Sequence, residues 1–435
     1  MIEIVAVEAL DIRFPTSKTL DGSDAMNPNP DYSAAVCILK TSVDGLDGHG
    51  MTFTIGRGTE ICVAAIEALT PFVIGLKLED IQADMAAFVR RMTGDSQLRW
   101  LGPEKGVVHL AAAAVINAVW DLWARAAEKP VWRLISEMEA DDIVGLIDFR
   151  HIHDVLSPEE ARAILADRRA GRAERIAKMQ REGLAAYTTS AGWLGYDDDK
   201  IRRLCREAVS AGWNALKFKV GMDAAQNLKR CRIAREELGP GRRLMIDANQ
   251  VWEVGEAITH VRHVAETSPW WIEEPISPDD ILGHRKVADA VRPIRVATGE
   301  HCQNRVMFKQ FLEADAIDVV QIDACRLAGL NENIAVMLMA AKFNKPVCPH
   351  AGGVGLCEYV QHLGAIDLIA IGGAREDRMV EFAGHLHEHF RDPVDVHDGV
   401  YWPTNNPGFS VAFLAESIAT YRYPNGSYWR AALRA

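Results

Sequence analysis

Six short polar signals recur at near-regular intervals along the second half of the chain, and most of them end a short apolar run. They are Lys217-Phe218-Lys219, Asp247-Ala248-Asn249, Glu273-Glu274-Pro275, Gly299-Glu300-His301, Asp323 and Pro349-His350. From Lys219 onward the intervals are between about 23 and 28 residues, as for successive strand–helix units. In a β/α barrel each strand delivers a polar side chain to one common face. The spacing therefore predicts a barrel and names most of its active-site residues.

Apolar runs that read as strands alternate with helical stretches from about residue 145 onward. The expected strands are 186–190, 214–219, 243–247, 270–273, 295–299, 317–323, 346–349 and either 367–371 or 378–382. Continuous apolar strands that alternate with helices imply a parallel sheet covered on both faces. About eight units over some 240 residues favour closure into a barrel over residues 141–399.

The first part of the chain has a different pattern, typical of an α+β domain over residues 1–140. Residues 2–14 and 33–42 read as strands, and two long stretches that follow, 58–92 and 105–138, have helical periodicity. Residues 21–32 are dense in Gly, Pro, Asn and Asp, which predicts a loop. The tail, 400–435, is rich in Pro, Gly and aromatic residues, and we expect it to pack back on this first domain.

The composition of the whole chain narrows the class of protein. A length of 435 residues exceeds one ordinary core and favours two domains. The net charge of −12 argues against nonspecific binding to nucleic acid or to an anionic membrane. The 8 cysteines are scattered without a C-x-x-C pair, which predicts free thiols in a reducing compartment. The N-terminus lacks the pattern of a signal peptide, so we expect a cytoplasmic protein.

Three carboxylates, Asp247, Glu273 and Glu300, end successive expected strands and can converge at the barrel mouth. Like charges at short range are costly, and a hard divalent cation removes that cost. Oxygen-only ligands favour Mg²⁺ over Zn²⁺. The alternative, ordinary solvated carboxylates, loses force because all three fall at consecutive strand ends. Asn249 would face the same way as Asp247, whereas Glu274 would face away.

A lysine pair and a histidine supply acid and base candidates. Lys217 and Lys219 are two residues apart on one strand, so both point to the same side. Each lowers the other's pKa, and so does a nearby cation, which makes Lys219 a candidate base. Lys217 is placed to hold a substrate carboxylate. The alternative is a solvated pair on an edge strand.

His350 ends a later strand, and Asp323 ends the strand before it, so a carboxylate–imidazole pair can form there. An isolated histidine at a strand end is more often structural, but here it shares the spacing of the metal ligands. Around a ring of strands, Lys219 and His350 lie on opposite sides of the metal. That arrangement suits removal of a proton from the carbon next to a carboxylate.

These motifs together resemble the mandelate racemase subgroup of the enolase superfamily, for which a Lys or His base with Mg²⁺ is a known pattern. Longer phrases are similar to the L-fuconate dehydratase family. They are Phe14–Ser17, Asp21–Met26, Asp31–Ala35, Phe53–Gly58, Ser96–Gly106, Gly192–Tyr196 and Pro349–Cys357. The resemblance extends over essentially the whole chain.

The resemblance implies a modified TIM barrel, (β/α)7β, with an N-terminal capping domain that the tail joins. It implies Mg²⁺ on Asp247, Glu273 and Glu300, with Lys219, His350 and Asp323 as the catalytic groups. The substrate-binding residues it implies are Gly22, Ser23, Asp24, Tyr32, Lys217, Asn249, Glu300, His350 and Glu381. It also implies a homo-oligomer and a loop at 21–32 that covers the barrel mouth.

The expected function is Mg²⁺-dependent dehydration of a small sugar acid, L-fuconate, to 2-keto-3-deoxy-L-fuconate. The first alternative is dehydration or epimerisation of a related acid sugar, such as a galactonate or an arabinonate. A second, from a different class, is an inactive relative that binds acid sugars. A cycloisomerase would leave His350 and Asp323 without an obvious role. Whether Lys219 or His350 protonates the leaving 3-hydroxyl stays open at this point.

Overall fold

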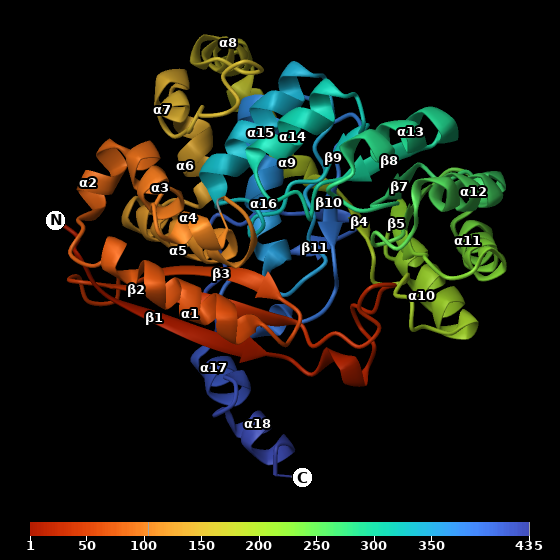
Figure 1. Cartoon of the computed structure of the whole chain (residues 1–435), viewed down its shortest axis with the longest axis horizontal. Coiled ribbons are helices and arrows are strands. Elements are labelled where there is room, and N and C mark those ends of the chain that lie inside the picture. The colour runs from red at the N-terminus through yellow and green to blue at the C-terminus, as the bar shows by residue number, and fades with distance from the viewer. Residues whose placement is uncertain (103, 435) are drawn as a thin grey trace.

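The computed structural model describes residues 1–102 and 104–434 and begins with a three-stranded antiparallel sheet (Figure 1). Its strands, in spatial order, are β1 (Ile4–Arg13), β2 (Ser33–Thr41) and β3 (Gly48–Thr54). The first two were expected, and β3 was missed. Pro103, within one of the phrases quoted above, and Ala435, at the end of the expected tail, lie outside the described residues.

Helices follow in the first part of the chain, and two of them, α1 (Thr59–Leu69) and α5 (Gly106–Ala126), pack against this sheet. The others are η1 (Thr16–Lys18), η2 (Thr70–Phe72), α2 (Leu78–Ala83), α3 (Met85–Thr93), α4 (Leu98–Leu101), α6 (Val131–Glu137) and α7 (Ala140–Gly145). A Cβ atom on Gly50 would lie 2.1 Å from the carbonyl oxygen of Ala114, so β3 needs glycine there to approach α5. Helix α5 is long and apolar enough to cross a membrane, but most of it is buried within the protein, as in a core helix.

The second part of the chain is a ring of parallel strands. They are β4 (Leu184–Thr188), β5 (Ala215–Lys219), β6 (Arg243–Asp247), β7 (Trp271–Glu273), β8 (Arg295–Thr298), β9 (Val319–Val320) and β10 (Val380–Phe382). Strands β4 to β9 are neighbours in chain order, and β10 pairs with β4. A parallel bridge from Val320 to Val347 adds the remaining strand position. Of the two segments proposed for the last strand, 378–382 is confirmed, because 367–371 forms the π-helix η4 (Asp367–Ile371).

Helices on the outside of the ring connect these strands. They are α10 (Asp198–Ser210), α11 (Ala224–Leu238), α12 (Val254–Val264), η3 (Ala265–Thr267), α13 (Ile281–Val291), α14 (Arg305–Glu313), α15 (Leu330–Lys342) and α16 (Leu356–Ile366). Residues 158–182 form two helices, α8 (Pro158–Arg169) and α9 (Arg172–Glu182), and Gly171 adopts φ 75° between them. The order of strands and helices confirms the (β/α)7β barrel with an α+β domain before it.

At the end where its strands begin, the barrel is closed by apolar and cation–π packing. The interior there holds Tyr187, Met245 and Trp271, all fully buried. The Trp270 ring lies 3.8 Å from the Arg243 guanidinium carbon. Strand β11 (Val396–His397) forms a hairpin with β12 (Val400–Tyr401), and β12 pairs antiparallel with the start of β4. Polar chemistry is therefore directed to the opposite end, where the strands finish.

The C-terminal segment returns to the first sheet. After η5 (His387–His389) come α17 (Ala415–Tyr421) and α18 (Ser427–Ala432), which extend beyond β1 in Figure 1. The backbone N–H of Tyr423 donates to the carbonyl of Asp11 at 2.8 Å, and the Trp429 indole N–H donates to the carbonyl of Arg13 at 3.0 Å. The division at residues 140 and 400 stays a prediction.

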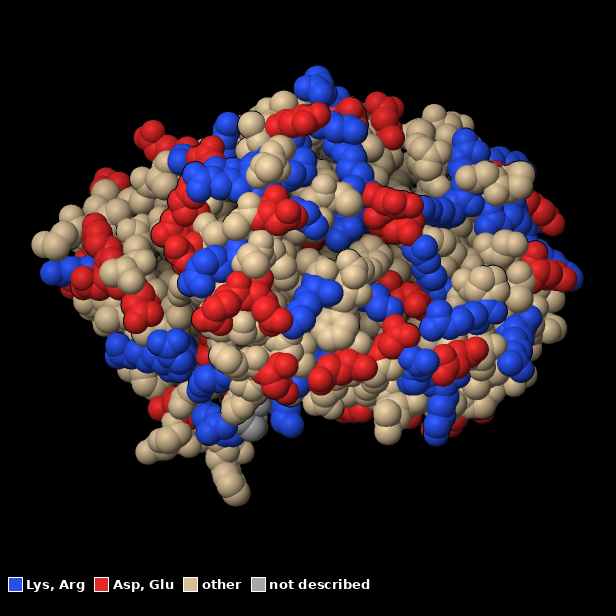
Figure 2. Space-filling view, turned by 90° about the horizontal axis from the view of Figure 1, so that it is seen from above, with Lys and Arg blue, Asp and Glu red and all other residues tan. Residues whose placement is uncertain are grey.

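A buried ion network joins the first part of the chain to the barrel. Glu332 on α15 accepts from Arg305 on α14 at 3.0 Å and lies 2.8 Å from His109 on α5. Arg305 also contacts Glu104, in the segment before α5, at 2.8 Å. All four side chains are buried or nearly so. On the face shown in Figure 2, by contrast, charges of both signs are interspersed rather than gathered by sign.

His362 gives the fold a pH dependence. Its Nδ1 accepts from the backbone N–H of Trp132, and its Nε2 lies 3.0 Å from Ser410 Oγ. Burial lowers the pKa of His362 to about 3, well below the ~6.5 of an unfolded histidine. Between these values the unfolded chain binds one more proton, so this part of the stability is complete above pH ~6.5 and is lost as the pH falls toward 3.

We therefore expect His362→Gln to flatten the decline in stability between pH 6.5 and 4.5. The effect approaches about 1.4 kcal/mol per pH unit for one group. Chemical denaturation of both proteins at several pH values measures it. Parallel stability curves for wild type and variant would contradict the assignment.

Candidate active site

Three carboxylates converge where β6, β7 and β8 finish. In the ladder Asp247 lies opposite Glu273, and Glu300 follows the end of β8 by two residues. One oxygen from each of the three lies within 4.8 Å of the others. Asp247 and Glu273 are fully buried, and Glu300 is 7% exposed. The three predicted ligands therefore do meet at one point.

The electrostatics of this cluster fit a divalent cation. Burial opposes the ionisation of Asp247, but Lys219 and Lys217 outweigh burial and lower its pKa. Burial, reinforced by Asp247, raises the pKa of Glu273 well above its usual range. The pKa values of these two carboxyl groups are shifted in opposite directions, which indicates more negative charge than the neighbouring lysines balance. In addition, Glu300 Oε2 is buried and accepts no hydrogen bond. An all-oxygen set that includes a buried oxygen without a hydrogen bond suits a hard cation such as Mg²⁺.

Lys219 lies beside the first of these carboxylates, with Nζ 2.6 Å from Asp247 Oδ2. Burial alone would lower its pKa, but the attraction of Asp247 outweighs burial and raises it. The predicted lowering of the pKa of Lys219 counted both the neighbouring Lys217 and a nearby cation. Without the cation, the direct contact with Asp247 across the strands outweighs Lys217. A cation bound by Asp247 would oppose that attraction.

Lys217 and Glu381 form a second, deeper contact. Lys217 Nζ lies 2.7 Å from Glu381 and 2.6 Å from Glu273. Glu381 also accepts from the Thr189 hydroxyl at 2.6 Å and from the backbone N–H of Ala351 at 2.9 Å. Neither side chain is among those that line the pocket. Contact of these two residues with a substrate stays a prediction.

The predicted histidine–aspartate pair forms on the other side of the cluster. His350 Nδ1 lies 2.8 Å from Asp323 Oδ2. The other oxygen of Asp323 accepts from the backbone N–H groups of Cys325 and Arg326, both at 2.7 Å. Burial would lower the pKa of His350, but Glu300 and Asp323 outweigh it and raise the pKa to about 10. The His350 ring is therefore oriented by a carboxylate that two backbone N–H groups hold in place.

Lys219 and His350 approach the carboxylate cluster from opposite ends. Lys219 contacts Asp247, whereas His350 Nε2 lies 3.2 Å from Glu300 Oε2. The backbone N–H of Gly352 lies 3.1 Å from the same Nε2. A Cβ atom on Gly352 would lie 2.9 Å from it, which explains the glycine. A ligand on the cluster thus has one base candidate on each side.

The expected loop at residues 21–32 covers the pocket and is tied to the barrel. The backbone N–H of Gly195 donates to Ser23 Oγ at 3.0 Å, and the Tyr196 hydroxyl contacts Asp21. Gly22, with φ 85°, packs against the Tyr32 ring, where a Cβ atom would lie 2.4 Å away. The Ser23 hydroxyl, through its bond to Gly195, holds the loop against the barrel.

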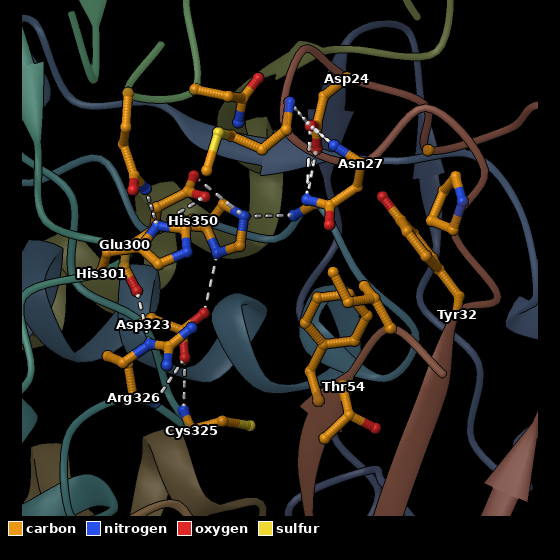
Figure 3. A pocket seen from close by; sticks show the side chains of 18 of the residues that line it. Asp24, Asn27, Tyr32, Thr54, Glu300, His301, Asp323, Cys325, Arg326 and His350 are labelled. Atoms are coloured by element: carbon orange, nitrogen blue, oxygen red, sulfur yellow. Dashed lines mark hydrogen bonds and ion pairs between the residues drawn. The ribbon is translucent and has the colours of Figure 1, made fainter. Parts of the chain in front are cut away.

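The pocket between loop and barrel has a volume of about 290 Å³. Figure 3 shows Asp24, Asn27 and Tyr32 facing Glu300 and His350 across it. Eight predicted site residues line it: Gly22, Asp24, Tyr32, Lys219, Asn249, Glu300, Asp323 and His350. The other predicted residues, Ser23, Lys217, Asp247, Glu273 and Glu381, lie behind this lining and are buried. Asn249 Oδ1 is buried without a hydrogen-bond partner, as a group awaiting a ligand would be.

Sequence reasoning missed part of the lining: Asn27, Phe53, Ile55, Leu110, Gln250, His301, Cys325 and Arg326. His301 and Gln250 follow strand-end motifs, and that position was the available signal. Glu274 is buried, and its carboxylate contacts His301 at 2.8 Å and Gln250 at 2.9 Å. Glu274, Glu300 and His301 also form a group with metal-ligand spacing. The direct contacts of Glu274 with these side chains make it a partner of His301 rather than an orphaned ligand.

Comparison with known proteins identifies the relatives of this chain. Residues 200–417 match the family described as enolase C-terminal domain-like. Residues 28–136 match the mandelate racemase / muconate lactonizing enzyme N-terminal domain. The crystal structure of human mitochondrial enolase superfamily member 1 superposes with a TM-score of 0.98 at 50% identity, over 100% of this chain and 99% of that one.

Two dehydratases are also similar. The L-galactonate dehydratase of Hypocrea jecorina is 51% identical over 98% of this chain and 96% of its own length. The L-talarate/galactarate dehydratase of Salmonella typhimurium, solved with Mg and L-lyxarohydroxamate, has a TM-score of 0.74 at 22% identity, over 96% of this chain and 91% of that one. The second likeness concerns the fold alone. On the matched domains and the full-length identities, the chain belongs to the mandelate racemase / muconate lactonizing enzyme family of the enolase superfamily.

Proposed function

We propose that this protein is a Mg²⁺-dependent sugar acid dehydratase that acts on L-fuconate. The observation that carries the proposal is the flanked cluster: Lys219 at Asp247 and His350 at Glu300, on either side of one cation-binding point. The relative named L-galactonate dehydratase, 51% identical, supports the same reaction class. The intact bases and ligands argue against an inactive binding protein.

Asp247, Glu273 and Glu300 would hold the Mg²⁺ ion. When bound, the ion neutralises negative charge that develops on a substrate carboxylate as the neighbouring proton leaves. Lys219, as the neutral amine, takes the proton from C2. Asn249 Oδ1, buried and without a partner, accepts from a substrate hydroxyl. The loop over the pocket excludes water while this happens.

The reaction breaks the C2–H and C3–O bonds. The electron pair from C2–H forms the C2=C3 double bond, and the 3-hydroxyl leaves as water once it receives a proton. The resulting enol ketonises to the 2-keto-3-deoxy acid. The ammonium of Lys219 serves a syn elimination, and His350, oriented by Asp323, is the alternative donor.

The choice of L-fuconate rests on the far wall of the pocket. L-fuconate is 6-deoxy-L-galactonate, so the two acids share their configuration and differ by a methyl in place of a hydroxymethyl group. Phe53, Ile55 and Leu110 form an apolar part of the lining, contributed by β3, the segment after it, and α5. An apolar wall favours the methyl group, because a hydroxyl placed there lacks a hydrogen-bond partner.

A panel of acid sugars with a keto-acid readout tests the proposal. We expect turnover of L-fuconate, a lower kcat/KM for L-galactonate, and weak or no turnover of arabinonates. Exhaustive EDTA treatment should abolish turnover, and added Mg²⁺ should restore it. Normal turnover after EDTA, or no keto acid from any acid sugar, would overturn the proposal.

A second candidate is dehydration of L-galactonate itself, which the 51% identical relative favours. Epimerisation at C2 uses the same two bases. Incubation in D₂O separates these reactions, since C2 exchange without keto acid would indicate epimerisation.

Replacing Leu110 with asparagine tests the apolar wall. We expect the ratio of kcat/KM for L-fuconate to that for L-galactonate to fall about 10-fold, since one methylene-sized contact discriminates to roughly that degree. Leu282→Asn is the matched control, because that leucine is 70% exposed on α13 and lies outside the pocket. An unchanged ratio in the Leu110 variant would remove this wall from the specificity argument.

A further inference from the structure

Arg326 contacts two parts of the site at once. It follows Asp323 by three residues, on the segment between β9 and α15, and lines the pocket (Figure 3). Its Nε donates to the backbone carbonyl of Glu300 at 3.1 Å. Its own backbone N–H donates to Asp323 at 2.7 Å. One residue thus links the third carboxylate of the metal cluster to the carboxylate that orients His350.

The link matters because Glu300 lies beyond the regular part of its strand. β8 ends at Thr298, whose carbonyl accepts from the backbone N–H of Gln321 at 3.0 Å. Gly299 then turns at φ 146° with its Cα pressed against Gln321, where a Cβ atom would lie 2.3 Å from the carbonyl oxygen. Among the described residues, the donor that reaches the Glu300 carbonyl is the Arg326 side chain. The guanidinium therefore replaces a ladder bond that the sheet no longer provides.

The charge of Arg326 is not used in an ordinary ion pair. Within the described ranges, no carboxylate oxygen lies within ion-pair distance of its guanidinium, whereas Arg285 and Arg305 each pair with two or more. The guanidinium of Arg326 thus bonds to the backbone of the site and not to a carboxylate.

We propose that Arg326 is a positioning residue that holds Glu300 and His350 in register. Without it, the Glu300 segment loses its anchor, and the 3.2 Å separation between Glu300 and His350 is no longer held. The inference rests on the proposed function for its catalytic consequence, but its consequence for cation binding is independent of the substrate.

The test is Arg326→Ala, with Arg326→Gln as the variant that retains neutral donors. We expect Mg²⁺ affinity and kcat for L-fuconate each to fall about 10- to 100-fold, as for other partners that orient metal ligands. KM should change less than kcat. Guanidinium ion added to the alanine variant should restore part of both. Arg326→Gln should retain more of both than the alanine variant.

Arg285→Ala is the matched control, because Arg285 also donates to backbone carbonyls, those of Ala314 and Asp315, but outside the pocket. Calorimetry with Mg²⁺ alone measures affinity without any substrate, and thermal unfolding confirms that each variant folds. If wild type turned over no acid sugar, the proposed function would fail while the calorimetric comparison would still decide the role of Arg326. Wild-type Mg²⁺ affinity and kcat in Arg326→Ala, or a loss equal to that of Arg285→Ala, would overturn the inference. So would a change confined to KM, which would indicate a substrate contact.

Discussion

Lys219→Met should lower kcat for dehydration about 10³-fold, within the range for loss of a general base. Methionine has nearly the same length as lysine but cannot accept a proton, so proton removal from C2 should fail. Formation of keto acid and deuterium exchange at C2 in D₂O should both be lost. Lys309→Met is a suitable control, since Lys309 pairs with Asp154 on the outside of the barrel.

Cation binding distinguishes this loss from damage to the site. Lys219 contacts Asp247 at 2.6 Å, and removing its positive charge leaves that carboxylate free for a divalent ion. Mg²⁺ affinity should therefore stay equal to that of wild type or increase. Dehydration by the variant at the wild-type rate would show that Lys219 is not the base.

Glu300→Gln should abolish Mg²⁺-dependent turnover, with a loss of about 10³-fold or more, because the amide lacks the negative charge that the carboxylate offers to a hard cation. Glu300 Oε2 is buried, makes no hydrogen bond and lies 3.2 Å from His350 Nε2, so the amide weakens the carboxylate that faces the cation-binding point. Ligands that bind only the folded state raise its stability. Added Mg²⁺ should thus raise the unfolding temperature of wild type and leave that of the variant unchanged.

Glu313→Gln provides the same chemical change at an exposed position on α14. It should retain both turnover and the thermal shift with Mg²⁺. An equal thermal shift in Glu300→Gln and wild type would remove Glu300 from the ligand set.

The convergence of the candidate site residues was predictable because it depends on local order. A residue at the end of a parallel strand faces the mouth of the barrel whatever surrounds it, and Asp247, Glu273 and His350 needed no more than that. Strand β3 was missed because Gly48 and Gly50 weaken its pattern, and their reason, the close approach of α5, is a tertiary contact. Local spacing therefore predicts which side chains share a face. It does not predict a strand whose residues are determined by packing against a helix distant in the chain.

The same limit applies to the pocket wall and to charge. Leu110 lies on a helix whose residues are apolar on most sides, so its periodicity does not indicate which leucine reaches the pocket. The raised pKa of Lys219 without a cation was not foreseen, because the contact with Asp247 depends on how two strands pair. Arg326 carries no sequence signal beyond its distance from Asp323. Each of these properties arises from packing between elements far apart in the chain.

The buried network of Arg305, Glu332, His109 and Glu104 has a consequence for how a substrate enters. Parting the first sheet and its helices from the barrel would leave buried charges uncompensated, at a cost of about 3–5 kcal/mol for one broken pair. The segment over the pocket is held instead by a few contacts such as that between Ser23 and Gly195. Entry and product escape should therefore be governed by local opening of that segment, with the two halves of the molecule moving as one body.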